Sequence, residues 1–284
     1  MRMTRKEFLK TVGIGLPALL CAGGGLCFGQ SRGEDIRGEI FRKDAPASAA
    51  YLNKGRPYAA GERLVQGDLA RMLRIIAKDG ARGFYHGEPA RLIVAGNRKG
   101  GGILSLEDFA QYKAVERKPL QCDYRGYRVT SAPPPSSGGV VICESLNVLS
   151  GWPVDPAGFH SAQPVHYMTE ALRRAFHDRN LQLGDPAFVH ADVDRLISQA
   201  YADELRRGID PDRATPSQSL LGAGASPEGH STTHLSVVDA AGNAVALTYT
   251  LNDWFGARVM AAGTGILLND EMDDFSAKPG ASNM

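Results

Sequence analysis

The sequence has no excess of charge of either sign and no cluster of metal ligands. Its 32 lysine and arginine residues balance 31 aspartate and glutamate residues, so the net charge of +1 does not indicate binding to nucleic acid. His160 and His166, or His230 and His234, could be imagined as metal ligands, but no cysteine or carboxylate falls at ligand spacing around them, so neither a metal nor another cofactor is expected. With 43% hydrophobic residues over 284 positions, the chain has the composition of a globular protein of one large or two modest domains.

Cysteine is also scarce, which excludes a fold held together by a disulfide framework. Two of the four cysteines, Cys21 and Cys27, lie in an amino-terminal segment that we expect to be removed, which leaves Cys122 and Cys143. An oxidising compartment permits a bond between these two. A single pair makes no framework, however, and buried free thiols are the favoured interpretation.

No apolar run is long and uninterrupted enough to predict a membrane span. Residues 12–29 are apolar but are broken by Pro17 and by three consecutive glycines. The charged region before them resembles a twin-arginine signal, with Lys6 in place of the second arginine. A charged region followed by a short apolar region is typical of an export signal. We therefore expect residues 1–30 to be removed, and the mature protein to be periplasmic or secreted without a stable membrane span.

Apolar periodicity after residue 60 predicts helices on both sides of a short strand region. Ser105 and Asp108 have the spacing of a capping box at a helix start. Residues 210–231, rich in Pro, Ser, Gly and Ala, form the clearest linker. The predicted elements are helices over 69–79, 84–96, 105–112, 140–149, 161–181 and 191–207, strands between 120 and 131, and a short strand near 50–52.

Two alternating runs around a turn predict a β-hairpin within residues 231–252. Residues 239–243 (DAAGN) supply the Asp, Gly and Asn that a five-residue hairpin loop favours. If the loop is symmetric about Ala241, the register places Thr232 opposite Thr250. Two hydroxyl groups that face each other across an antiparallel pair can share a hydrogen bond. The hairpin is therefore a candidate to carry a hydroxyl nucleophile.

Other interpretations of these residues are available. Threonine suits strands in general, so the hairpin by itself favours a purely structural role for both threonines. His234 stands beside the candidate nucleophile, whereas the other histidines are expected at the surface or in hydrogen bonds. Asp273 and Asp274 are disfavoured as an acid–base pair, because adjacent side chains on a strand point apart.

Several motifs, in order over residues 50–284, resemble the γ-glutamyltranspeptidase family, whose members are glutathione hydrolases. Of the last four motifs, two form the hairpin and two follow it. The others match the later part of that family's large subunit. The motifs lie at residues 64–66 (LVQ), 112–117 (YKAVER), 123–127 (DYRGY), 133–139 (PPPSSGG), 184–186 (GDP), 232–239 (TTHLSVVD), 242–252 (GNAVALTYTLN), 263–269 (GTGILLN) and 272–276 (MDDFS).

The resemblance implies an α+β fold of the N-terminal-nucleophile (Ntn) hydrolase type, an αββα sandwich that is incomplete here. It implies a proenzyme that cuts itself between Ser231 and Thr232 and then carries the γ-glutamyl group of glutathione as an ester on Thr232. Water, an amino acid or a peptide accepts that group. Thr250 is implied to hydrogen-bond the nucleophile, and Asn252, Glu271 and Asp274 to bind the α-amino and α-carboxyl ends of the substrate.

The same resemblance divides the chain into an export signal at 1–30, the later part of a large subunit at 31–231, and the start of a small subunit from Thr232. The two pieces are expected to stay partners after the cut. The family also has an arginine that clamps the substrate carboxylate, in an Arg-Glu-x-Ala-Pro motif. Arg42 lies in a similar string, but much too near residues 64–66, and we interpret it as unrelated to the clamp.

The chain is expected to be truncated at both ends relative to the family. The downstream serine pair and the glycine pair that forms the oxyanion hole are not found, so we expect weak stabilisation of the developing charge, with unpaired sheet edges and uncovered apolar faces. Descent favours a γ-glutamyltransferase and glutathione hydrolase. For these 284 residues by themselves, an inactive remnant of the family is the favoured interpretation, and a module that binds γ-glutamyl compounds without turnover is a third.

Overall fold

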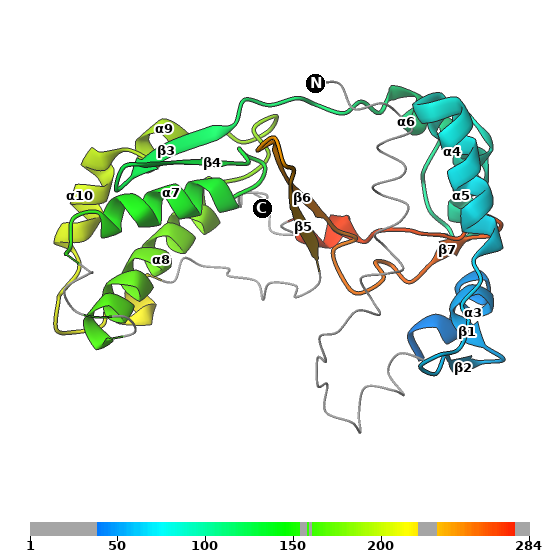
Figure 1. The fold of residues 1–284 in the computed structure, drawn as a ribbon, viewed down its shortest axis with the longest axis horizontal. Coiled ribbons are helices and arrows are strands. Elements are labelled where there is room, and N and C mark those ends of the chain that lie inside the picture. Colours follow the sequence, from blue (N-terminus) through cyan, green and yellow to red (C-terminus); the bar gives the residue numbers. More distant parts are fainter. Residues whose placement is uncertain (1–38, 154–157, 159–160, 221–231, 276–284) are drawn as a thin grey trace. The chain divides into compact units, whose positions relative to one another are not determined.

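The computed structural model describes residues 39–153, 158, 161–220 and 232–275 (Figure 1). The described residues form two compact units, one of residues 39–114 and 232–271, the other of residues 115–220 and 272–275. The predicted export signal and Ser231 lie outside the described residues. No helix in the part of the chain that the structure describes is both long enough and apolar enough to cross a bilayer.

The helices of the first unit that lie wholly within the described residues include α3 (Ala45–Tyr51), α4 (Gly67–Tyr85), α5 (Glu88–Lys99) and α6 (Leu106–Gln111). The predicted capping box at the start of α6 is confirmed, because Ser105 and Asp108 exchange side chain to backbone hydrogen bonds. The predicted end of a helix at residues 79–80 is confirmed. Gly80 has non-helical backbone angles, with a φ of +64°, so α4 consists of two helical segments joined by a kink, and the second segment ends at Tyr85.

The predicted strand near residues 50–52 is mostly helix. Asp44 caps α3, since its carboxylate accepts the N–H of Ala47 at 2.8 Å, and the helix extends to Tyr51. Only then does a short ladder form between β1 (Leu52–Asn53) and β2 (Arg56–Pro57). A local side-chain cap therefore decides this segment against strand propensity.

The carboxyl-terminal part of the first unit packs against these helices. Here β7 (Met260–Ala261) pairs with β8 (Ile266–Leu267), and Met260 joins a buried cluster with Phe41, Ala47 and Leu52. In addition, Arg71 donates to the carbonyl oxygen of Gly263 at 2.5 Å. These contacts join segments about 200 residues apart in the sequence.

The β-hairpin forms as predicted, from β5 (Thr233–Val238) and β6 (Ala244–Tyr249). The register is confirmed, since Val238 pairs with Ala244 and Thr233 with Tyr249. Every residue of both strands is exposed, and among the described residues no third strand pairs with either one. The expected unpaired edges and uncovered apolar faces are thus present at this hairpin.

The second unit combines one hairpin with four helices. The hairpin is β3 (Leu120–Tyr124) with β4 (Tyr127–Ser131), and the helices are α7 (Gly138–Leu149), α8 (Ala162–Gln182), α9 (Val193–Leu196) and α10 (Gln199–Arg207). The helix predicted over 191–207 is instead two helices. Ser198 interrupts it, because its hydroxyl accepts the N–H of Tyr201 at 3.2 Å and caps α10.

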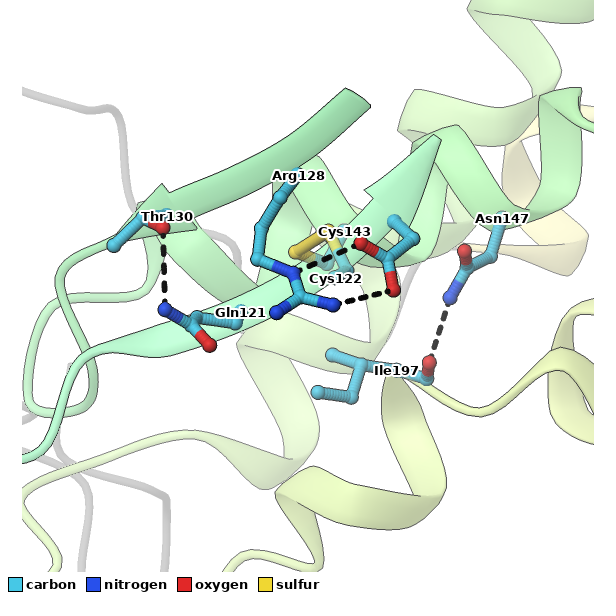
Figure 2. Close-up of a disulfide and its surroundings, with 8 residues drawn as sticks. Gln121, Cys122, Arg128, Thr130, Cys143, Asn147 and Ile197 are labelled. Atoms are coloured by element: carbon cyan, nitrogen blue, oxygen red, sulfur yellow. Dashed lines mark hydrogen bonds and ion pairs between the residues drawn. A yellow bond between two sulfur atoms is a disulfide. The ribbon is translucent and has the colours of Figure 1, made fainter. Parts of the chain in front are cut away.

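The prediction of free thiols in this unit is wrong. Cys122 on β3 and Cys143 on α7 form a disulfide, with their Cα atoms 5.8 Å apart (Figure 2). The sequence spacing alone could not show this proximity, which arises because α7 packs its buried face on β3 and places Cys143 in the same core cluster as Leu120 and Val140. The bond therefore joins the strand layer to the helix layer.

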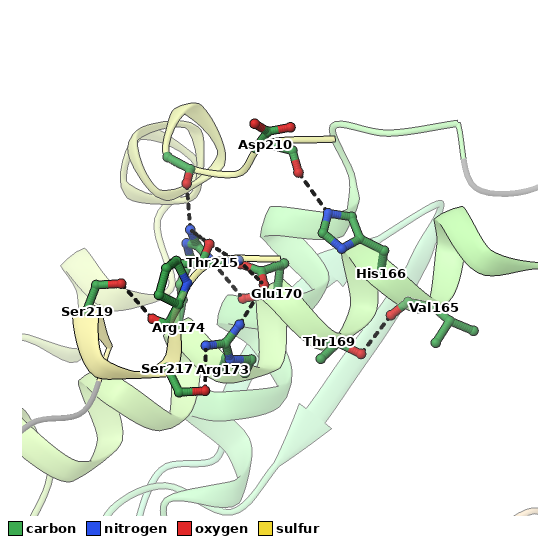
Figure 3. A network of polar contacts seen from close by, with 12 residues as sticks. Val165, His166, Thr169, Glu170, Arg173, Arg174, Asp210, Thr215, Ser217 and Ser219 are labelled. Atoms are coloured by element: carbon green, nitrogen blue, oxygen red, sulfur yellow. Dashed lines mark hydrogen bonds and ion pairs between the residues drawn. The ribbon is translucent and has the colours of Figure 1, made fainter. Parts of the chain in front are cut away.

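The start of the predicted linker is fixed along one face of α8, and we call residues 208–220 the strap. Glu170 is fully buried, and its carboxylate accepts hydrogen bonds from the N–H and the hydroxyl of Thr215 at 3.1 and 2.6 Å (Figure 3). Arg174 also pairs with Glu170 and donates to the carbonyl oxygen of Gly208 at 2.7 Å. Further contacts follow the same face of α8, from His166 to Asp210, from Arg173 to Ser217 and from His177 to Leu220.

The charge state of Glu170 reflects these donors. Burial opposes ionisation, but the hydrogen bonds from Thr215 and Arg174 outweigh it and lower the pKa of Glu170 to about 2. The carboxylate therefore stays ionised at neutral pH and holds the strap through charge-assisted bonds, which are stronger than neutral ones.

The disulfide leads to a first prediction. Closing a loop of 21 residues reduces the entropy of the unfolded chain, which stabilises a fold by about 3 kcal/mol. We expect a C122A/C143A variant to unfold in urea with a free energy lower by about that amount, and dithiothreitol to lower the wild-type value similarly. Dithiothreitol should leave the variant unchanged. Equal stability of the oxidised wild type and the variant would contradict this assignment.

A second prediction concerns the strap. The change Thr215→Val removes a hydroxyl that donates to a buried carboxylate, and an unsatisfied buried group costs about 1–3 kcal/mol. We expect amide hydrogen exchange of residues 210–220, followed by mass spectrometry, to accelerate about tenfold or more. Thr169→Val is the matched control, because the exposed Thr169 hydroxyl only donates to Val165 on the same helix (Figure 3). If both variants exchange like the wild type, the hydroxyl of Thr215 does not hold the strap.

Candidate active site

The two threonines of the sequence prediction meet at the open end of the β5–β6 hairpin. The hydroxyl of Thr232 donates to Oγ1 of Thr250 at 3.3 Å. The opposite end of the hairpin fixes the register, since the Asp239 carboxylate accepts the N–H groups of Ala241 and Asn243 at 2.9 and 2.8 Å. Gly242 completes this turn with a φ of +81°, which suits glycine. The turn chemistry thus positions a hydroxyl pair about a strand's length away.

Asn252 is tied directly to this pair. Its backbone N–H donates to Oγ1 of Thr250 at 2.8 Å, so the same oxygen accepts from both Thr232 and Asn252. The side-chain amide nitrogen of Asn252 donates to the carbonyl oxygen of Asp270 at 3.2 Å. Asn252 has a φ of +73°, a left-handed conformation that asparagine tolerates better than most residues. The structure therefore brings together three of the five predicted site residues.

The remaining two predicted residues lie on one short element. Glu271 begins and Asp274 ends the 3-10 helix η2 (Glu271–Asp274). Side chains three apart on a 3-10 helix project from the same side, so these two carboxylates share a face that Asp273 does not. Glu271 directly follows Asp270, the partner of Asn252. Its backbone N–H donates to the side chain of Asn269 at 3.1 Å.

His234 does not contact either threonine of the pair. Its ring nitrogens lie 2.7 Å from the hydroxyl of Thr248 and 3.3 Å from that of Ser236. These three residues form a polar row on one exposed face of the hairpin, so His234 has a local hydrogen-bonding role. In the part of the chain that the structure describes, no three His, Cys, Asp or Glu residues gather as metal ligands.

Asp270 and Asp253 were missed by the sequence reasoning. The Asp270 carboxylate accepts the backbone N–H of Asp253 at 3.0 Å, and its own N–H donates to the carbonyl oxygen of Leu251 at 3.1 Å. The Asp253 carboxylate in turn pairs with Arg258. The only signal for Asp270 in the sequence was its place between the motif at 263–269 and Glu271. These contacts close the loop that begins at Asn252.

Arg42 lies at a different part of the first unit. It lines an open cavity of about 690 Å³ together with Lys43, Asp44 and Arg258. The interpretation of Arg42 as unrelated to the carboxylate clamp stays a prediction.

The site's chemistry is that of an oriented hydroxyl. A threonine hydroxyl becomes a nucleophile when a neighbouring group fixes its direction and a base accepts its proton. Thr250 supplies the first requirement through the hydrogen bond from Thr232. An amine at the start of the chain can supply the second, if the bond before Thr232 is cut.

Comparison with known proteins gives the family to which this chain belongs. The model of the family described as gamma-glutamyltranspeptidase matches residues 21–284. The glutathione hydrolase proenzyme of Pseudomonas sp. (strain A14) is 56% identical over 245 residues, which is 86% of this chain and 43% of that protein. The chain spans less than half the length of that relative, and it spans 47% of the glutathione hydrolase proenzyme of Escherichia coli (strain K12), to which it is 43% identical.

Solved structures agree. The γ-glutamyltranspeptidase of Helicobacter pylori aligns with a TM-score of 0.64 and 37% identity, covering 68% of this chain and 57% of that one. The cephalosporin acylase of Bacillus halodurans aligns with a TM-score of 0.73 and 30% identity, covering 84% and 42%. The predicted fold class, an incomplete α+β fold of the Ntn hydrolase type, is confirmed. The chain belongs to the γ-glutamyltranspeptidase family.

Proposed function

We propose that this chain carries the nucleophile and the amine-binding groups of a γ-glutamyl hydrolase and transferase that is made as a self-cleaving proenzyme. The observation that carries the proposal is the hydrogen bond from Thr232 to Thr250, with Asn252 bound to the same oxygen. This arrangement fixes a hydroxyl next to a predicted substrate-binding residue. Family membership supplies the reaction class.

The first step is an attack of the Thr232 hydroxyl oxygen on the carbonyl carbon of Ser231. The acyl group moves from the nitrogen of Thr232 to its oxygen, and the hydroxyl proton ends on the released amine. Water then hydrolyses the ester, which frees the Thr232 hydroxyl and leaves a carboxylate on Ser231. Thr250 contributes by holding Oγ1 of Thr232 in one direction, which lowers the entropy lost on reaching the transition state.

In the second reaction the freed α-amine acts as the base for the hydroxyl of Thr232. Its reference pKa of about 7.7–8.0 leaves a useful fraction of neutral amine near pH 7.5. Oγ1 attacks the γ-carbonyl of glutathione, and cysteinylglycine leaves with the proton. The γ-glutamyl ester then passes to water or to the amine of an amino acid or peptide.

The substrate class follows from the carboxylates of η2. A γ-glutamyl group carries an α-ammonium, which Glu271 and Asp274 can bind from the same side of the 3-10 helix. Charge-assisted hydrogen bonds are about twice as strong as neutral ones, so these residues favour an amine-bearing donor. Asn252 Oδ1 adds a further acceptor, because the hydrogen bond to the Asp270 carbonyl oxygen uses Nδ2 of the same side chain.

An acylase activity is the second candidate function. It rests on the alignment with a cephalosporin acylase over 84% of this chain. A donor without an α-ammonium would not supply the positive charge that Glu271 and Asp274 are proposed to bind, which disfavours such a donor. Comparing γ-glutamyl and glutaryl anilides as donors separates the two functions directly.

Export to an oxidising compartment remains our proposal for localisation. The charged and apolar pattern of residues 1–30 motivates it. The disulfide between Cys122 and Cys143 adds support, because structural disulfides persist mainly outside the reducing cytosol.

A third prediction tests the nucleophile. We expect the purified wild-type chain to separate into two pieces at Thr232 and to release product from a γ-glutamyl anilide. Thr232→Ala should abolish both events, because the attacking oxygen is gone. Thr232→Ser keeps that oxygen and should still cut, about tenfold more slowly, because the hydroxyl of serine rotates more freely.

Mass spectrometry follows the cut, and absorbance follows the release of the anilide. Thr233→Ala is the matched control, since it changes the neighbouring threonine. Cleavage that still occurs in Thr232→Ala would contradict the assignment of Thr232 as the nucleophile. A wild-type chain that stays whole and inert would favour an inactive remnant, and glutamate binding by calorimetry without turnover would favour a binding module.

A fourth prediction tests the orienting hydroxyl. Thr250→Val removes the oxygen that accepts from both Thr232 and Asn252, while it keeps the shape of the side chain. We expect the half-time of self-cleavage to lengthen about tenfold, the size of one lost net hydrogen bond. Thr248→Val, which removes only the contact to His234, should cleave at the wild-type rate. Equal half-times for both variants would contradict a role for Thr250.

A further inference from the structure

Asn252 and its two neighbouring peptide groups make hydrogen bonds to Thr250 and to Asp270. Its own N–H is bound by Oγ1 of Thr250 at 2.8 Å, and its side-chain amide by the carbonyl oxygen of Asp270 at 3.2 Å. The carbonyl before it, on Leu251, accepts from the N–H of Asp270 at 3.1 Å, and the N–H after it, on Asp253, donates to the Asp270 carboxylate at 3.0 Å. Thr250 already belongs to the proposed site. Asp270 has had no role until now.

A substitution at position 270 can remove the contact that the Asp270 side chain makes. Its two backbone contacts, to Leu251 and to Asn252, survive any substitution that keeps the main chain in place. The bond from the N–H of Asp253 depends on the carboxylate alone. An amide group follows the position of its peptide, so this bond sets the peptide plane between Asn252 and Asp253.

That peptide needs an external partner. Asn252 adopts a φ of +73°, and Phe255 and Arg258 in the same loop have φ values of +64° and +59°. Three residues other than glycine in this conformation cost free energy that the surroundings must offset. The loop is held at its far end by Arg258 on Asp253 and by the N–H of Ala257 on the Leu268 carbonyl oxygen, at 3.0 Å. Its near end depends on Asp270.

We propose that Asp270 is a positioning residue for the γ-glutamyl site, holding Asn252 so that its free acceptor and its bond to Thr250 are aligned together. The inference rests on the proposed function, because it assigns Asn252 to the substrate. Asp270 touches neither the substrate nor the reacting atoms. It acts through the peptide of Asp253 and through the side-chain amide of Asn252.

The alternative is that Asp270 merely ties two loops together. Both roles predict some loss of stability when the carboxylate is removed. Only the positioning role predicts that the side-chain amide of Asn252 changes its surroundings and that donor binding weakens more than turnover. Only that role predicts rescue by asparagine, since Asp270→Asn keeps Oδ1 as an acceptor for the N–H of Asp253.

The experiment compares Asp270→Ala and Asp270→Asn in the full chain. Asp108→Ala is the matched control, because the Asp108 carboxylate also accepts a backbone N–H in the first unit, that of Ser105 at 2.7 Å, in the capping box of α6. Nuclear magnetic resonance of the 15N-labelled chain reports the side-chain amide of Asn252, assigned through its loss in Asn252→Asp. Steady-state hydrolysis of γ-glutamyl anilide gives KM and kcat.

We expect Asp270→Ala to shift the Asn252 amide signals toward those of a solvent-exposed asparagine and to raise KM about tenfold, with kcat changed about threefold or less. Asp270→Asn should stay within about twofold of the wild type in KM, with its Asn252 signals in place. Asp108→Ala should leave both readouts unchanged, whatever it does to the melting temperature.

Unchanged Asn252 signals in Asp270→Ala overturn the inference, as does an equal loss of function in Asp270→Ala and Asp270→Asn. A wild-type chain that hydrolyses no anilide overturns the proposed function instead. The resonance measurement then still decides whether Asp270 sets the conformation of Asn252, because it needs no turnover.

Discussion

The candidate nucleophile is oriented by one exposed hydrogen bond, from the hydroxyl of Thr232 to that of Thr250 at 3.3 Å. Such a bond between neutral hydroxyl groups contributes only about 1 kcal/mol and does not hold a strand by itself. Its geometry is set by the ladder of the hairpin, whose register places the two residues opposite each other. A slip of one residue would turn Thr232 to the other face. The Asp239 turn prevents that slip with two bonds from backbone N–H groups.

The Thr232–Thr250 pair is exposed, so the hydrogen bonds of the surrounding backbone, and not burial, fix its position. Thr250, Asn252 and Asp270 form a short chain of hydrogen bonds at the open end of the hairpin, and the left-handed loop after Asn252 is closed by the pair of Asp253 and Arg258. Strained loops of this kind persist where the surroundings fix them, and they cluster at functional sites. Oγ1 of Thr250 accepts one hydrogen bond from the strained residue Asn252 and another from the candidate nucleophile Thr232.

The second unit shows two ways to bury a carboxyl group. Glu170 receives four donors and is ionised, with its pKa lowered to about 2 although burial acts against ionisation. Glu144 on α7 is 1% exposed and its oxygens find no hydrogen bond within the described residues. Burial first, and then the nearby Asp178, raise its pKa to about 9. Glu170 thus serves the strap, whereas nothing in the structure explains the burial of Glu144.

Local patterns predicted much of this fold. The hairpin register, the capping box at Ser105 and the extent of α7 follow from alternation, turn residues and helix signals within a few positions. What failed needed distant contacts: the disulfide of Cys122 and Cys143 arises from packing of α7 on β3, and the role of Asp270 from a return of the chain to the loop after Thr250. The spacing of residues in the sequence does not show which distant segments come into contact. The helix break at Ser198 could have been predicted, because serine is a favoured N-cap residue. The apolar periodicity that continues across Ser198 favoured a single helix instead.

We propose that the chain is cut immediately before Thr232 and that Thr232 then carries the γ-glutamyl ester. Amino-terminal sequencing of the smaller piece after purification tests it most directly. The account predicts a single new terminus that reads Thr-Thr-His-Leu-Ser, beginning at Thr232. A piece that begins at any other residue, or a chain that yields no new terminus, would contradict it.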